Sequence, residues 1–299
     1  MDNPEIPALF DHLEPYQTER WGRERFDYAI GTKGPKKFFV KSAKTRQHHT
    51  NIQREVVWNE FMNRVEAFYP ERHFVGLRIE RRVGAGSLVF DYLDVPLLAD
   101  DDELGAWQAQ LARYADMCET FDRVAVNWKA DNLPDEPSRS LRLYATWQSW
   151  LGDAANRVKQ LDKARTLVEA SQFKLMRCLQ HGGPLTPHEI FVDGDCWVIV
   201  DGEHCGTDLF RYTDLADAYC RLYGYHGAKS SAQELLQNFI LHHERPNDQF
   251  LKDFIPVLTH RCVALIADAF RDQAERDYVT EAEELLGRCI DRDVSAIVG

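Results

Sequence analysis

The first hundred residues alternate apolar and polar side chains with the short period of β-strands. Residues 25–44, RFDYAIGTKGPKKFFVKSAK, contain two β-rich runs around a Gly-Thr-Lys-Gly-Pro segment, a pattern that predicts a β-hairpin. Residues 73–98 contain two further strand-like runs on either side of Gly84-Ala85-Gly86. This part of the chain is therefore predicted to be a sheet of short strands.

One helix is predicted within this β-rich region, over residues 50–68. Its apolar residues recur at the spacing of a single helical face: Val57, Phe61, Val65 and Phe68. Thr50 stands where a side chain that caps the helix is expected. The predicted order of elements is β-β-β-α-β-β.

From about residue 100 the pattern changes to the longer period of helices. Acidic residues begin the first such segment, as the helix dipole favours. Helices are predicted over residues 101–121, 140–158, 161–180, 213–225, 230–243, 250–270 and 279–290. One stretch interrupts them, because residues 190–201 form two apolar runs around Asp193-Gly194, a strong hairpin signal.

These patterns predict an α+β fold of two lobes. A β-rich lobe with one helix is expected over residues 1–95, and a larger, mainly helical lobe over residues 96–299. The helical lobe is expected to hold the segment 181–204, and the hinge is expected near Tyr92–Leu98.

Composition places the chain among ordinary globular proteins. Of its 299 residues, 44% are hydrophobic and 28% are charged. The sequence contains no apolar run near the ~20 residues that cross a membrane, and its start, MDNPEIPALF, has no secretory pattern. Its seven cysteines form no CxxC pair, which favours reduced thiols and a cytoplasmic protein.

Charge separates the two parts of the chain. Residues 1–100 are neutral overall, whereas residues 101–299 carry the whole net charge of −12. Such a field disfavours nucleic acid and favours a cationic ligand, although solubility alone also explains it.

Lys41 is the first candidate for chemistry. It lies in the apolar run FFVKSAK, where a buried lysine requires a partner. The following helix offers Glu55, with Glu60 as a second choice. A lysine held by a glutamate orients ATP phosphates in phosphoryl transfer. The alternative is a lysine on an edge strand that points to solvent.

Asp201 and Glu189 are the second candidates. Asp201 ends the run WVIVD beside Gly202, and the predicted hairpin brings Glu189 close to it. Two carboxylates at the mouth of a hairpin suit Mg²⁺. The alternative is a pair of solvated acids in turns.

Together these motifs resemble the aminoglycoside phosphotransferase and choline kinase-like family, which has a protein-kinase-like fold. The family pattern H-G-D-L-x-x-x-N, then a hairpin and I-D-x-E, corresponds here to HGGPLTPHEIFV and VIVDGEH, and Asp214-Leu215-Ala216 matches a later D-L-A. LVFDYLDVPLL resembles the strand and hinge that hold adenine. The resemblance covers Phe26 to Ala216 in the expected order.

The resemblance implies roles for individual residues. Lys41 and Glu55 would hold the ATP phosphates, Asp201 would be the main Mg²⁺ ligand, and Glu189 would take the position of the second ligand. His181 would be a scaffold residue, and Asp214 a buried structural acid. ATP and Mg²⁺ are the cofactors it implies.

Three departures from the family pattern bear on activity. Gly183-Pro184 replaces the aspartate that accepts the proton of the acceptor hydroxyl, with one residue inserted. Glu189 replaces the metal-binding asparagine, and Trp21-Gly22-Arg23 is no Gly-rich phosphate loop. Glu189 or Glu203 is a candidate substitute for the missing base, whose loss reduces rates by about 10²–10⁴-fold.

Two functions follow from these departures. The first is a pseudokinase-like protein that binds nucleotide or regulates a protein partner. The second is an active ATP-dependent phosphotransferase for a small hydroxylated, perhaps cationic, molecule. The sequence leaves open whether the chain is an enzyme, because a protein can bind nucleotide without a catalytic base.

Other chemistries are weaker. His181, His188, His204 and Cys205 lie close in sequence but match no common zinc spacing. Cys205 is expected to be a small packing residue, and His242-His243 a solvated helix end. No basic and aromatic patch predicts nucleic-acid binding.

Overall fold

The computed structural model describes residues 4–17, 24–99, 101–128, 147, 149–183, 185–272 and 278–299. The chain divides into two compact units. The first combines the residues up to Leu98 with His188–Cys205, and the second contains the remaining described residues.

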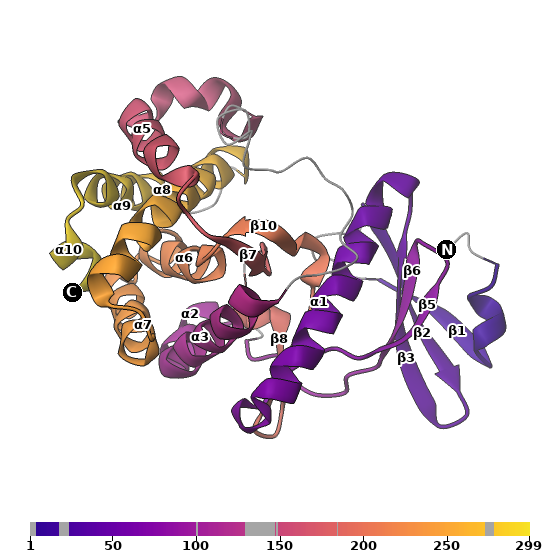
Figure 1. Cartoon of the computed structure of the whole chain (residues 1–299). Coiled ribbons are helices and arrows are strands. Elements are labelled where there is room, and N and C mark those ends of the chain that lie inside the picture. Colours follow the sequence, from indigo (N-terminus) through magenta and orange to yellow (C-terminus); the bar gives the residue numbers. More distant parts are fainter. Residues whose placement is uncertain are drawn as a thin grey trace. The chain divides into compact units, whose positions relative to one another are not determined.

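An antiparallel sheet of five strands forms the centre of the first unit (Figure 1). Its spatial order is β1-β2-β3-β6-β5. The strands are β1 (His12–Tyr16), β2 (Phe26–Lys33), β3 (Lys36–Ala43), β5 (Ile79–Val83) and β6 (Ser87–Asp91). The predicted hairpin is confirmed, since Lys33 pairs with Lys36 around Gly34, whose φ of 57° favours glycine.

Helix α1 (His49–Phe68) packs on one face of this sheet. Phe26, Leu88 and Phe90 of the sheet form a buried cluster with Ile52 of the helix. Val57, Phe61 and Val65 are buried as predicted.

Two details of the predicted helix were wrong. Thr50 does not cap it, because the helix already begins at His49 and the residue at the N-cap position is His48, whose side chain makes no cap hydrogen bond. Phe68 is 65% exposed, because it is the last helical residue and the buried face ends one turn earlier, at Val65.

A second sheet ties residues 188–205 to the first unit. β8 (Ile190–Asp193) and β9 (Cys196–Ile199) form the predicted hairpin around Gly194. β9 also pairs in parallel with β4 (Phe74–Gly76). The sequence placed this hairpin in the C-terminal lobe, but its backbone hydrogen bonds to β4 group it with the first unit.

The second unit is mainly helical. Its helices are α2 (Glu103–Ala109), α3 (Leu111–Asn127), α5 (Leu161–Gln172), α6 (Thr213–Cys220), α7 (Lys229–His242), α8 (Asn247–Asp272), α9 (Val279–Asp291) and α10 (Val294–Val298). A π-helix, Arg221–Tyr225, extends α6. Short 3₁₀-helices elsewhere in the chain span Pro7–Leu9, Arg46–His48, Pro70–Arg72, Gly152–Arg157, Pro187–Glu189 and Gly202–His204.

One predicted helix of this unit is in part a strand. α5 ends at Gln172, and Arg177–Gln180 forms β7, which pairs antiparallel with β10 (Gly206–Phe210). Helical spacing continues through this segment, but the pairing partner lies about thirty residues later, beyond the reach of a local pattern. No helix within the described residues is long and apolar enough to cross a membrane.

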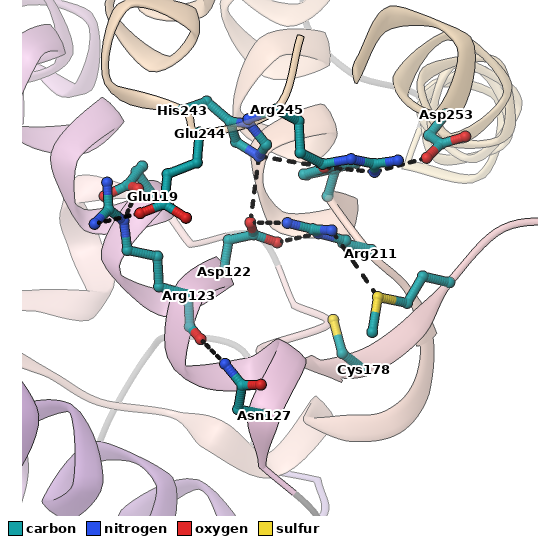
Figure 2. A network of polar contacts seen from close by, with 12 residues as sticks. Glu119, Asp122, Arg123, Asn127, Cys178, Arg211, His243, Glu244, Arg245 and Asp253 are labelled. Atoms are coloured by element: carbon teal, nitrogen blue, oxygen red, sulfur yellow. Dashed lines mark hydrogen bonds and ion pairs between the residues drawn. The ribbon is translucent and has the colours of Figure 1, made fainter. Parts of the chain in front are cut away.

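A buried ion pair links α3 to the connection between β10 and α6 in the second unit (Figure 2). Asp122 of α3 accepts two hydrogen bonds from the guanidinium of Arg211, at 2.6 and 2.5 Å. His243 Nε2 lies 3.4 Å from the same carboxylate and 3.2 Å from the hydroxyl of Tyr212. The predicted solvated end at His243 was wrong, because its side chain is 3% exposed and belongs to this network.

The Asp122–Arg211 pair provides a test of the second unit. Asp122→Ala is expected to lower the free energy of unfolding by about 3–5 kcal/mol, because it leaves Arg211 buried without its partner. Urea denaturation measures this change. As a control, Lys252→Ala removes an exposed pair with Asp248 and should change the value by less than about 1 kcal/mol. Equal effects of the two variants would contradict the assignment.

Candidate functional site

Lys41 lies in the middle of the five-stranded sheet. It faces Tyr28 of β2 on one side and Leu88 of β6 on the other, so β3 is not an edge strand. The residue is 4% exposed, which excludes the solvent-facing alternative for this lysine. A buried ammonium at such a position requires charged partners.

Three carboxylates surround the Lys41 ammonium. Glu55 of α1 forms the closest ion pair, and Glu60, the other candidate, is exposed. Glu203 Oε2 lies 2.9 Å from Nζ, and Asp201 Oδ1 lies 3.2 Å from it. The lysine therefore joins a strand, a helix and the segment after β9 within the first unit.

These charges fix the protonation of the centre. Burial alone lowers the pKa of Lys41, but attraction to Glu55, Asp201 and Glu203 outweighs burial and holds this pKa well above its ordinary value. Burial also raises the pKa of the nearby Tyr28 to about 12. Lys41 is therefore a permanent cation beside a neutral phenol.

Asp201 is the most accessible of the three acids. Its side chain is 46% exposed, whereas those of Glu55 and Glu203 are almost fully buried. Its backbone adopts the left-handed conformation, with φ 64° and ψ 41°. A side chain on the next residue, Gly202, would overlap the Cβ atom and the indole ring of Trp58, so only glycine fits there.

Glu203 is held on both of its oxygens. Oε2 accepts from Lys41, and Oε1 lies 2.7 Å from Arg25 Nη2 and 3.2 Å from His204 Nε2. Burial would raise the pKa of Glu203, but the bonds from His204 and Lys41 hold this pKa well below its ordinary value. A carboxylate so stabilised in its charged form is a poor proton acceptor.

The donor set suits a hard divalent cation. Oxygens of Glu55, Asp201 and Glu203 lie within 4.8 Å of one another. Carboxylate oxygens are the ligands that Mg²⁺ takes in proteins, and the exposed Asp201 is the one open to a new ligand. Lys41 already neutralises part of the charge of this group.

Glu189 is not part of that carboxylate group. Its carbonyl accepts from Val200 N at 3.0 Å, which places its backbone opposite the residue before Asp201. Among the described residues, the metal-ligand group includes no histidine or cysteine, so the zinc set is not assembled. Cys205 is fully buried and donates to the carbonyl of Arg54, as expected of a packing residue.

The backbone of the His-Gly turn in the second unit is held by a buried carboxylate. The Asp214 carboxylate accepts from His181 N at 2.8 Å and from Gly182 N at 3.0 Å. Asp214 is a buried acid and His181 a buried ring, as the resemblance implied. Gly183 follows this turn, while Pro184 and the segment Trp21–Arg23 lie outside the described residues.

Sequence reasoning missed two residues beside Lys41. Arg25 contacts Glu203, and the Phe26 ring lies under the Lys41 ammonium, 4.5 Å from its centroid. Strand alternation could have indicated Phe26. Phe26 and Tyr28 are two residues apart on β2 and so lie on one face of the sheet, and Lys41 pairs with Tyr28 on the neighbouring strand. Nothing local indicated Arg25.

A cavity of about 590 Å³ opens beside β1 and β2 of the first unit. Tyr16, Phe26 and Tyr28 are among its lining residues. Phe26 connects it to the charged centre, since the same ring contacts Lys41. The volume is in the range of small-molecule sites.

No protein-family model and no curated protein matches the sequence. Solved structures match nearly the whole chain. The microcompartment-associated aminopropanol kinase superimposes with a TM-score of 0.62 at 14% identity, over 98% of this chain and 97% of that one. For choline kinase LicA from Streptococcus pneumoniae the TM-score is 0.56 at 12% identity, over 96% of each chain.

A third match carries a nucleotide. It is a thermostable mutant of aminoglycoside phosphotransferase APH(4)-Ia in a ternary complex with ADP and hygromycin B. Its TM-score is 0.56 at 9% identity, over 97% of this chain and 98% of that one. The chain therefore has the protein-kinase-like fold of these proteins, as its motifs predicted.

The charged centre predicts a specific dependence of stability on pH. The pKa of Glu203 is 4.5 when unperturbed and is lower in the folded protein, so the carboxylate stabilises the fold above pH 4.5. This contribution is lost as the pH falls from 4.5 through the folded pKa. Glu203→Gln should therefore destabilise by about 3–5 kcal/mol at neutral pH and by progressively less in acid.

Urea denaturation at several pH values measures this difference between wild type and variant. Glu14→Gln is the matched control, because Glu14 is 60% exposed and pairs only on the surface with His12. Its effect should stay below about 1 kcal/mol at every pH. An effect of Glu203→Gln that is independent of pH would refute the assignment.

Proposed function

We propose that the first unit binds a nucleoside di- or triphosphate together with Mg²⁺. The observation that carries this proposal is the buried ammonium of Lys41, held by Glu55 beside the half-exposed carboxylate of Asp201. A cation fixed in place and an accessible acid are the two elements that phosphate and its metal require. The ADP bound to the aminoglycoside phosphotransferase of like fold supports the choice of ligand.

Lys41 and Glu55 act together in this proposal. Glu55 stabilises the ammonium and fixes its direction, so that Lys41 contributes a positive charge to the phosphates with little loss of side-chain entropy on binding. Asp201 is the main metal ligand, and Glu189, across the hairpin, is the second. The metal, when bound, neutralises phosphate charge.

We assign the nucleoside to the cavity beside β1 and β2, whose lining residues lie outside the segment 88–98 that the resemblance implied for adenine. Tyr16 and Tyr28 offer aromatic faces there, which suit a purine ring. Phe26 borders both this cavity and Lys41, so a base in the cavity has its phosphates within reach of the cation.

Nucleotide binding is tested by thermal shift and calorimetry with Mg²⁺·ATP and Mg²⁺·ADP. A ligand at 100 times its Kd should stabilise the wild type by about 2.7 kcal/mol. Lys41→Ala and Asp201→Asn should abolish most of this gain, whereas Lys37→Ala, an exposed lysine on the same strand, should retain it. A wild type that neither nucleotide stabilises would refute the proposal.

The chain is proposed to be pseudokinase-like, binding nucleotide without rapid transfer. Gly183-Pro184 stands where the acceptor-activating aspartate is expected. Glu203 is poorly suited to replace it, because both of its oxygens are bonded to cations and its pKa is lowered. Glu189 remains the candidate substitute base. Such a protein would act through a protein partner in the cytoplasm.

A slow but active phosphotransferase is the second candidate. The observation that favours it is the retained turn at His181, whose backbone Asp214 still holds. A phosphoryl group and metal in position leave only the base to be replaced, a loss of about 10²–10⁴-fold. The acceptor would be a small hydroxylated molecule, and the acidic excess of residues 101–299 favours a cationic one.

Restoring the missing aspartate separates these two functions. We would replace Gly183-Pro184 by a single aspartate, which recreates the spacing H-G-D-L, and measure transfer from Mg²⁺·ATP to a panel of amino alcohols and aminoglycosides. The pseudokinase predicts no detectable transfer by the wild type and measurable transfer by the restored variant, because a general base contributes about 10²–10⁴-fold to the rate.

The opposite result identifies an enzyme. Wild-type transfer that is lost on Asp201→Asn and on Glu189→Gln would establish the phosphotransferase with a substitute base. Lys37→Ala, an exposed change away from the charged centre, is the control for both assays.

A further inference from the structure

Glu203 bridges two cations in the first unit. Its Oε2 lies 2.9 Å from Lys41 Nζ, and its Oε1 lies 2.7 Å from Arg25 Nη2. Arg25 directly precedes β2, and 30% of its side chain is exposed. One carboxylate thus fixes a buried ammonium and a more accessible guanidinium side by side.

The ring of Phe26 supports the same two charges. Lys41 Nζ lies 4.5 Å from the ring centroid, and Arg25 Cζ lies 5.5 Å from it. The ring itself is 1% exposed, so its position is fixed by the core. Cations within about 6 Å of an aromatic face are attracted to it. Both cations are therefore preorganised without any ligand.

Arg25 has hydrogen-bonding capacity that Lys41 lacks. Lys41 already contacts three carboxylates and is almost fully buried. The guanidinium of Arg25 has about five N–H donors, and within the described residues its side-chain contacts are with Glu203 and Phe26. Several donors therefore remain for another anion.

The charge balance also leaves room for a phosphate and its metal. Glu55, Asp201 and Glu203 contribute three negative charges, and Lys41 and Arg25 contribute two positive ones. A divalent cation at Asp201 makes the centre positive overall. Two fixed cations plus a metal are then available to a polyphosphate.

The sequence before Arg25 explains why a side chain would be needed. Trp21-Gly22-Arg23 lacks the repeated glycines that let backbone N–H groups approach phosphate. A guanidinium supplies a planar pair of donors that matches phosphate oxygens.

We infer that Arg25 is a second phosphate-binding cation, which Glu203 positions beside Lys41 for the distal phosphates of a nucleoside di- or triphosphate. This inference rests on the proposed nucleotide binding. It makes Glu203 a positioning residue for both cations. Arg25 then selects ligands by the length of their phosphate chain, and adenosine does not depend on it.

Calorimetry with three probes tests the inference on the full chain. The probes are Mg²⁺·ADP, adenosine and inorganic tripolyphosphate. Arg25→Gln should weaken binding of Mg²⁺·ADP and of tripolyphosphate about ten- to hundredfold and leave the Kd of adenosine unchanged. Arg25→Lys keeps the positive charge but lacks the planar pair of N–H donors, so its affinity for Mg²⁺·ADP and tripolyphosphate should lie between those of Arg25→Gln and the wild type.

Arg82→Gln is the matched control, because Arg82 is an exposed arginine of the same unit that contacts only the carbonyl of Gly84 among the described residues. It should leave all three affinities unchanged. Denaturation midpoints of the variants show whether each is folded. If Arg25→Gln does not fold, the comparison of Arg25→Lys with the wild type replaces it.

The outcomes separate this inference from the function on which it rests. Equal affinities of wild type and Arg25→Gln for Mg²⁺·ADP overturn the role of Arg25 and leave nucleotide binding intact. An equal loss for adenosine and ADP also overturns it, because the residue is then only structural. A wild type that binds none of the probes overturns both proposals.

Discussion

The first unit depends on the burial of one ammonium group. Lys41 stands in a central strand among apolar neighbours, and such a charge is stable there only when acids enclose it. Those acids come from two places in the chain: Glu55 from a helix, and Asp201 and Glu203 from the segment after β9. The lysine thereby draws residues far apart in sequence into one centre, and the pairing of β9 with β4 brings the last segment to it.

The same requirement shapes the rest of the centre. Glu203 needs Arg25 and His204 to balance its own burial, and Gly202 must be glycine because Trp58 occupies the space of a side chain. Asp201 alone stays accessible. A centre that satisfies its buried charges internally while leaving one carboxylate open is prepared for a metal and an anion, and the proposed binding of Mg²⁺·nucleotide uses this asymmetry.

The second unit also contains two buried acids whose charge is balanced by hydrogen bonds. Asp122 of α3 pairs with Arg211, the residue after β10, and Asp214 binds the backbone of the His-Gly turn. The turn therefore keeps its shape although the aspartate expected after it is absent. The two are compatible, because backbone hydrogen bonds to a buried acid hold the turn independently of the next side chain.

Sequence alone determined what depends on neighbours along the chain. Alternation and turn residues predicted both hairpins, helical spacing predicted most helices of the described residues, and ordered motifs predicted the fold. The motifs also predicted the contact of Lys41 with Glu55 and the burial of Asp214, whereas the metal-binding role of Asp201 stays a prediction. Three predictions from local pattern were wrong where long-range contacts decide the structure. The segment Arg177–Gln180 was predicted as helix but forms the strand β7, Phe68 was predicted on the buried face but is exposed, and His243 was predicted to be solvated but is buried. Only the tertiary structure brought Arg25 to Glu203 and Glu203 to Lys41, because charges separated by many residues meet only when the backbone has folded.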